Sequence, residues 1–189
     1  MAEHALPFDE LNALEAYVGV VLEAKNNGLT ESKTAEDDII DELLDLYLLA
    51  YAEGNQYAND DLGSEVAPNV DDMYAEINRR IEGKTFVDRV REYVNDGTVA
   101  DIMRVAVTDT HRIMEAGAYD TAIKGGATYK TWVAVMDERT RDTHFYLDGT
   151  RKRLDEEFYT FNGHHAMFPS QFGVAEEDCN CRCWITYSK

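Results

Sequence analysis

The chain has 189 residues, of which 44% are hydrophobic and 11% aromatic, which is enough to bury a folded core and excludes a disordered polypeptide. No run reaches the roughly 18 to 20 apolar residues that a bilayer-spanning helix needs. Met1–Pro7 also lacks the basic and apolar character of a secretory leader. We therefore expect no membrane association and a location in the cytoplasm of the cell that makes the protein.

The formal charge of −19 is unevenly distributed along the chain. Residues 1–98 carry 23 acidic and 7 basic side chains, whereas residues 99–189 carry 14 and 11. An acidic surface repels phosphate backbones, so nucleic-acid binding through the first half is not expected. Such a surface favours basic protein partners, although a solvated acidic helical face would have the same composition.

The first half of the chain is predicted to be helical. Apolar residues recur at helical spacing from Leu11 to Val21, and Asn26-Asn27-Gly28 stops this run. A second helix is expected to begin at Thr34 and to end at Gly54. Residues 55–69 are then expected to form a loop or hinge.

Two further helical stretches follow this loop. The apolar pattern resumes over residues 71–97, with a weak point at Gly83, and a further helix is predicted over 99–117 after an N-cap at Thr98. Residues 119–123 add at most a short turn. An acidic helical region over residues 1–98 is therefore predicted to precede a distinct module.

After Gly125-Gly126 the hydrophobic period changes from helical to alternating. Residues 128–136 alternate as a strand does, and Asp137 is expected to cap a short helix over 139–147 that ends at Gly149.

The remainder of the chain is predicted to be extended or irregular. Leu154–Phe161 is a second strand or an extended arm, residues 162–178 are irregular, and residues 182–187 form a terminal strand. The predicted fold class is α+β: a helical region over 1–98, then a module over 99–189 that consists of helix 99–117 and a small α+β part with few strands over 126–189.

Short motifs follow one another in the last sixty residues. They are Lys130-x-Trp132, Asp137-x-Arg139-Thr140-Arg141-x-x-His144, Leu147-Asp148-Gly149, Phe158, Pro169 and Asn180-Cys181-Arg182-Cys183. In this order they resemble the Mu F-like family of phage minor head proteins, which act in head morphogenesis. Upstream, Thr108-Asp109-Thr110-x-Arg112 resembles another family segment, with aspartate where glutamate is usual. Each string is weak alone, but the ordered set is specific, and it covers roughly Val105–Tyr187.

The resemblance implies a non-enzymatic virion protein of a tailed bacteriophage. Such a protein is expected near the portal, in head assembly and in DNA packaging or ejection. Its implied partners are the portal protein and scaffolding or coat proteins. Its implied location is the virion, in the head interior or at the portal vertex, after assembly in the bacterial host cytoplasm.

The motif residues allow two physical interpretations. In the first, they form a polar network in which the stretch from Arg141 to Gly149 lies against the stretch from Asn180 to Cys183 and fastens the module. Asp148 and Arg182 would belong to this network. In the second, the side chains bind zinc.

The zinc interpretation rests on residue types. His144, Cys181 and Cys183 are types that zinc accepts, with Cys179, His164 or His165 as helpers. Cysteines at positions i, i+2 and i+4 do not form the C-x-x-C turn of a zinc knuckle, and inward-facing thiols could simply be small buried hydrophobic groups. No cofactor is therefore expected, and zinc is kept as the alternative.

Two other functions stay open. A hydrolytic module could use the same histidines and cysteines, and domains that resemble this family also occur fused to toxin domains. Arg151-Lys152-Arg153 is a basic cluster that could touch DNA, but a solvated turn is the expected explanation.

Overall fold

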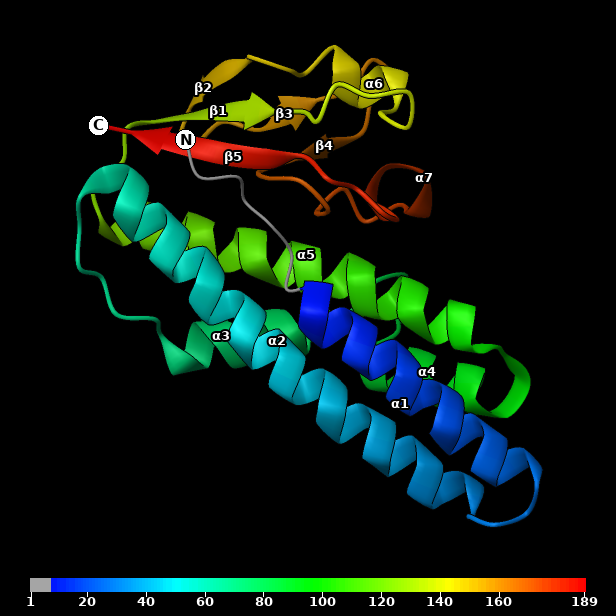
Figure 1. The fold of residues 1–189 in the computed structure, drawn as a ribbon. Helices are drawn as coiled ribbons and strands as arrows, with labels where there is room; N and C mark the ends of the chain where they lie inside the picture. The colour runs from blue at the N-terminus through cyan, green and yellow to red at the C-terminus, as the bar shows by residue number, and fades with distance from the viewer. Residues whose placement is uncertain (1–7) are drawn as a thin grey trace.

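The computed structural model describes residues 8–189, so the expectation for Met1–Pro7 lies outside the described residues. Five helices form the larger part of the fold (Figure 1): α1 (Phe8–Asn26), α2 (Ser32–Leu62), α3 (Val70–Ile77), α4 (Phe86–Asp96) and α5 (Val99–Lys124). Among the described residues, no helix has the length and apolar character needed to cross a membrane.

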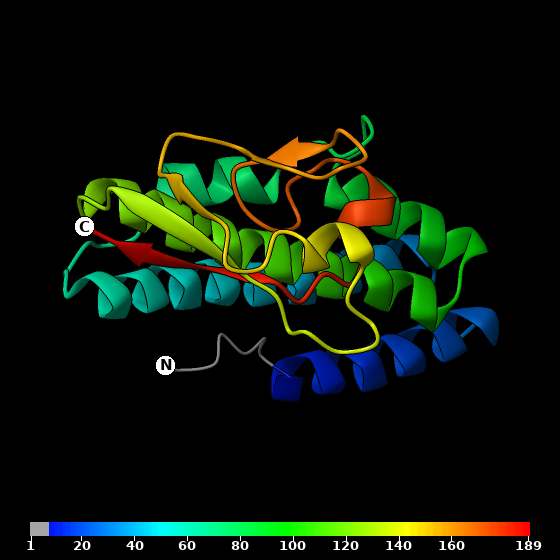
Figure 2. The same cartoon turned by 90° about the horizontal axis from the view of Figure 1, so that it is seen from above.

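A small module of short strands and single-turn helices lies on one side of α5 (Figures 1 and 2). Its elements are β1 (Tyr129–Val133), α6 (Asp142–Phe145), β2 (Arg151–Arg153), β3 (Phe158–Tyr159), β4 (His165–Ala166), α7 (Ala175–Asp178) and β5 (Trp184–Ser188). Strand β1 pairs antiparallel with both β2 and β5, and β3 with β4. The predicted α+β class, with a helical first half and a few strands, is confirmed.

Helix α5 contributes to two hydrophobic clusters. Ile113 and Met114 pack with α1, α2, α3 and α4, whereas Ala118 and Ala122 pack with Trp132 and other residues of the strand module. The backbone N–H of Tyr187 in β5 also donates to Asp61 Oδ2 at the end of α2, over 3.0 Å. The helical region and the strand module therefore share α5, and the boundary proposed at residue 98 stays a prediction.

Two glycines that were expected to end helices instead lie where α2 crosses α5. Helix α2 continues past Gly54 to Leu62, and α5 continues past Gly117 to Lys124. A Cβ atom on Gly54 would lie 1.8 Å from the carbonyl oxygen of Met114, and one on Gly117 would lie 2.3 Å from that of Tyr51. The predicted helix ends and the predicted loop start at residue 55 are wrong, because these glycines permit close backbone approach.

Other boundaries also differ from the prediction. The helical pattern over 71–97 is divided into α3 and α4 by a short bridged loop in which Ile81 pairs with Lys84. Helix α2 begins at Ser32 and not at Thr34. The segment Arg151–Arg153, expected to be a turn, is strand β2, and Arg151 lies over the Tyr129 ring at 4.0 Å.

Buried charges fix the shorter helices to α5. Asp109 is 0% exposed and accepts a hydrogen bond from Arg89 of α4 over 2.6 Å. Arg112, 2% exposed, pairs with Glu76 of α3 and lies 3.6 Å from Asp109. Because an unpaired buried charge is costly, these pairs specify how α3 and α4 sit on α5.

Replacing Gly54 with alanine is expected to destabilise the protein by roughly 3 kcal/mol, because the new methyl group meets backbone that cannot move independently. Chemical denaturation measures the effect. The control is Gly19→Ala in α1, where a Cβ meets nothing within 4 Å and helix propensity should add about 0.5 to 1 kcal/mol of stability. Equal effects of the two substitutions would contradict the close crossing.

Candidate functional site

The polar stretches expected to meet do lie together. His144, on α6, places its Nδ1 atom 3.5 Å from the sulfur of Cys181 and 3.5 Å from the sulfur of Cys183. Arg141 donates a hydrogen bond to the carbonyl oxygen of Cys179. The predicted contact between the stretch from Arg141 to Gly149 and the stretch from Asn180 to Cys183 is therefore confirmed.

The two cysteines face inward because of the local backbone. Asn180 adopts a left-handed conformation, with φ of 54°, that redirects the chain after α7. From Cys181 into β5 the burial alternates along the chain, so that Cys181, Cys183 and Ile185 are buried while Arg182 and Trp184 are partly exposed. Residues two apart thus point the same way, towards α6.

The opposite side of the His144 ring faces a buried carboxylate. The Nε2 atom lies 3.2 Å from Glu177 Oε2, and the same oxygen accepts a hydrogen bond from the Thr143 hydroxyl over 2.7 Å. Burial opposes ionisation of Glu177, but the hydrogen bonds from Thr143 and His164 outweigh it and lower the pKa of this carboxyl. The His144 ring therefore lies between a carboxylate and two sulfur atoms, and its Nε2 atom approaches the carboxylate without forming a regular hydrogen bond.

The two thiols differ in acidity. Burial raises the pKa of Cys181, but contacts with Cys183 and His144 overcome this and hold the pKa of this thiol well below its usual range. The neighbouring Cys181 sulfur, together with burial, raises the pKa of Cys183.

Asp137 has a different role from the one expected. Both of its carboxylate oxygens accept hydrogen bonds from the Arg182 guanidinium, over 2.7 and 2.5 Å, and these bonds hold the pKa of Asp137 below its usual range. Helix α6 covers only Asp142–Phe145 and its N-cap is Arg141, so the prediction that Asp137 caps it is wrong. A bidentate pair joins the loop after β1 to the segment before β5.

Asp148 and Gly149 close the loop that contains α6. The Asp148 carboxylate accepts a hydrogen bond from the backbone N–H of Ala134 over 2.8 Å. Gly149 has φ of 70°, and its N–H donates to the carbonyl oxygen of Trp132 over 2.9 Å. These contacts bring the chain back beside β1, so that β2 can pair with it.

Lys130 and Trp132 form the centre of the module. Trp132 is 0% exposed, and its ring contacts His144 and Phe158 edge-on. Lys130 is also 0% exposed, donates to the Met167 carbonyl oxygen over 2.8 Å and lies over the Phe158 ring. Burial lowers the pKa of Lys130 to about 8, with nearby carboxylates such as Glu157 opposing the shift.

His164 and His165, the other histidines considered as zinc ligands, are not part of the group formed by His144, Cys181 and Cys183. His164 approaches Glu177 over 3.1 Å on the side away from His144, and His165 pairs with Glu157 over 3.0 Å. Glu177 was missed by the sequence analysis, because it belongs to a segment without periodicity and no spacing links it to His144. The contacts of Glu177 with His144 and Thr143 are what assign it to the site.

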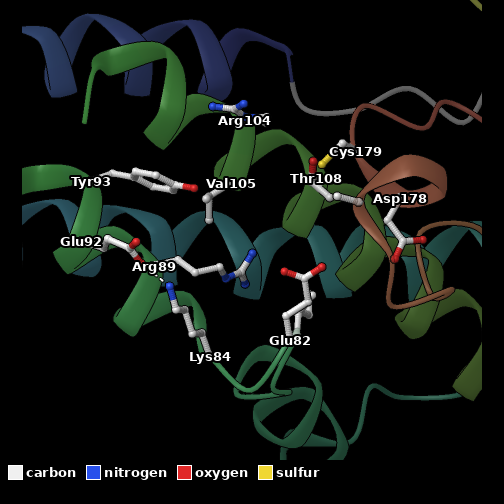
Figure 3. A pocket seen from close by; sticks show the side chains of 12 residues that line it. Glu82, Lys84, Arg89, Glu92, Tyr93, Arg104, Val105, Thr108, Asp178 and Cys179 are labelled. Atoms are coloured by element: carbon white, nitrogen blue, oxygen red, sulfur yellow. Dashed lines mark hydrogen bonds and ion pairs between the residues drawn. The ribbon is translucent and has the colours of Figure 1, made fainter. Parts of the chain in front are cut away.

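A separate hollow lies between α4, α5 and α7 (Figure 3). Lys84 and Glu92 pair with each other there, while Arg89 of α4 and Glu82 of the loop before it point towards each other (Figure 3). Asp178 and Cys179 line this hollow, whereas His144, Cys181 and Cys183 do not. The hollow is thus distinct from the His144 cluster.

Comparison with known proteins assigns the chain to a family. The model for the family described as Phage Mu protein F like protein matches residues 63–186, so the chain belongs to that family. The resemblance stated from the sequence motifs is confirmed. The matched region begins directly after α2 and includes α3, α4, α5 and the strand module.

Two curated relatives match parts of the chain. Minor head protein GP7 of Bacillus phage SPP1 is 36% identical over 93 residues, which cover 48% of this chain and 30% of that protein. A protein named NAD(+)–arginine ADP-ribosyltransferase EFV, from Enterococcus faecalis, is 37% identical over 131 residues, which cover 66% of this chain and 25% of that protein. The chain thus spans less than a third of the length of either relative.

No solved structure gives a significant match to the chain. Family membership and the similarity to a phage minor head protein support a phage head protein.

The burial of Lys130 predicts a pH dependence of stability. The unfolded lysine keeps its proton up to about pH 10.4, whereas the folded one begins to release it near pH 8, so the unfolded state binds more protons between these values. The free energy of unfolding is therefore expected to rise by roughly 1–2 kcal/mol from about pH 8 to about pH 9.5. Denaturation of the Lys130→Met variant provides the comparison, because this variant should lack the rise. If its free energy of unfolding rises with pH as in the wild type, Lys130 is not the group responsible.

Proposed function

We propose that this chain is a non-enzymatic minor head protein of a tailed bacteriophage that acts near the portal in head assembly and in DNA packaging or ejection. The observation that carries the proposal is the similarity to a phage minor head protein, together with the family match over residues 63–186. The proposed location is the virion, in the head interior or at the portal vertex, after assembly in the host cytoplasm. Mass spectrometry of purified heads tests this, and heads that lack the chain would contradict it.

The charge of the α1–α2 pair supports a basic protein partner. Exposed carboxylates follow one another along α2, at Asp38, Asp41, Glu42 and Asp45. Glu42 and Asp45 line a groove between α1 and α2 whose walls also include the half-exposed Tyr17. A portal surface with basic side chains fits this face, and scaffolding or coat proteins are the other candidates.

Neutralising the acidic face is expected to weaken portal binding. A variant with Asp38→Asn, Asp41→Asn, Glu42→Gln and Asp45→Asn should bind the cognate portal protein at least tenfold more weakly at low salt, because long-range attraction is lost. Wild-type binding should also weaken as salt rises, which calorimetry or co-purification measures.

The matched control neutralises four exposed carboxylates outside this face: Asp60→Asn, Glu65→Gln, Glu138→Gln and Glu156→Gln. This control changes the net charge equally and should retain most of the binding. Equal loss in both variants would attribute the effect to net charge, and salt-independent binding would exclude an electrostatic interface.

A second function is favoured by one observation, the match to a protein named an arginine ADP-ribosyltransferase. In this alternative the chain is a toxin-associated module. The matched segment covers a quarter of that protein, so the named activity belongs to a chain four times as long as the shared part. The neighbouring genes distinguish the two functions: portal and terminase genes would favour the head protein, and an immunity gene would favour the toxin-associated module.

The non-enzymatic proposal predicts no transfer of ADP-ribose. The purified chain is incubated with labelled NAD⁺ and an arginine-rich acceptor protein, and label on the acceptor is measured against a chain-free control. Label above that control, lost on heat denaturation of the chain, would contradict the proposal and support the alternative.

A further inference from the structure

Three buried ligand atoms converge between α6 and the segment before β5. They are His144 Nδ1, Cys181 Sγ and Cys183 Sγ, which all lie within 4.8 Å of one another. The three side chains come from two segments that are 37 to 39 residues apart in sequence. Folding alone therefore assembles the group.

The spacing of these atoms matches a tetrahedral metal site. Zinc binds imidazole nitrogen at about 2.0 to 2.1 Å and thiolate sulfur at about 2.3 Å. At a tetrahedral angle these lengths put nitrogen and sulfur about 3.6 Å apart. Both nitrogen–sulfur distances in the cluster are 3.5 Å, so an ion fits with little movement of the ligands.

We propose that His144, Cys181 and Cys183 bind one Zn²⁺ ion that joins α6 to the segment before β5. The inference is independent of the proposed head function, because it rests on the ligand geometry alone. The C-x-C spacing does not prevent binding. Both sulfurs lie 3.5 Å from His144 Nδ1 and therefore point to the same side of their segment, and the histidine supplies the third ligand.

The surroundings of His144 suit a metal-bound imidazole. Histidine ligands usually direct their second ring nitrogen at a carboxylate, which fixes the tautomer and leaves the other nitrogen free for the metal. Here Nε2 faces Glu177 Oε2 over 3.2 Å, and Thr143 holds that oxygen in place. Glu177 is 1% exposed, and its other carboxylate oxygen lies 3.1 Å from His164 Nδ1.

A small pocket lies beside His144 and Cys183, and its other walls include Thr140, Asn180 and three arginine side chains. Its volume of about 10 Å³ is close to what one water molecule occupies. Three protein ligands and one water would give the proposed zinc its usual four-coordinate geometry.

The full chain, expressed with zinc in the medium and purified without chelators, is analysed by elemental mass spectrometry. The expected content is about one zinc per chain. Exchange with Co²⁺ then separates this site from adventitious binding to surface carboxylates, since only cysteine ligands give a thiolate-to-cobalt charge-transfer band in the near ultraviolet. Cobalt bound without that band would overturn the proposal.

Variants locate the ligands. Cys183→Ser and His144→Gln should each lose most of the zinc, whereas Cys179→Ser should keep it, because Cys179 is half-exposed and lies outside the converging group. Glu177→Gln should retain the fold but bind zinc 10- to 100-fold more weakly. If Cys179→Ser loses as much metal as Cys183→Ser, the ligand assignment is wrong.

A measurement on the wild-type chain avoids the risk that a variant fails to fold. Removing zinc with a chelator should lower the melting temperature, and adding Zn²⁺ back should restore it, because a ligand that binds the folded state stabilises it. A zinc-free chain whose melting temperature does not respond to Zn²⁺ would show that the three side chains form a hydrogen-bonded cluster only.

Discussion

The burial of helix α5 on several sides is the constraint on which the rest of the fold depends. One side of α5 packs so closely against α2 that Gly54 and Gly117 have no room for a Cβ atom. Another carries Asp109 and Arg112, whose charges require partners from α3 and α4. The strand module covers a further side, so both hydrophobic clusters include residues of this helix.

The strand module is itself held to α5 by polar contacts. His111, on α5, lies 2.9 Å from the Ser170 hydroxyl, and the Tyr119 hydroxyl donates to the Leu154 carbonyl oxygen over 3.0 Å. The cluster of His144 with the two cysteines closes the far end of the module. Its elements are only two to five residues long, so such contacts must replace the long ladders that stabilise larger sheets.

The sequence predicted the fold class, the change of period after Gly126 and the meeting of α6 with the cysteine segment. It did not predict that Gly54 and Gly117 lie inside helices, because glycine can either end a helix or admit a neighbouring backbone. The choice depends on the partner helix, which a local pattern does not contain. Asp137 was misassigned for the same reason, since its partner Arg182 is 45 residues away.

The family match begins at residue 63, whereas the excess of acidic residues extends over residues 1–98. The match begins after α2 and therefore includes α5 with its partners α3 and α4. Helices α1 and α2 lie outside the match and carry the acidic face assigned to a partner in the proposed function.

Unfolding followed by two signals tests most directly whether α5 makes the helical region and the strand module one cooperative unit. Both tryptophans, Trp132 and Trp184, belong to the strand module, whereas far-ultraviolet circular dichroism reports mainly the long helices. If α5 couples the two parts, the fluorescence and dichroism transitions should coincide at every denaturant concentration. Two separate transitions, with the tryptophan signal lost while the helices persist, would contradict a shared core.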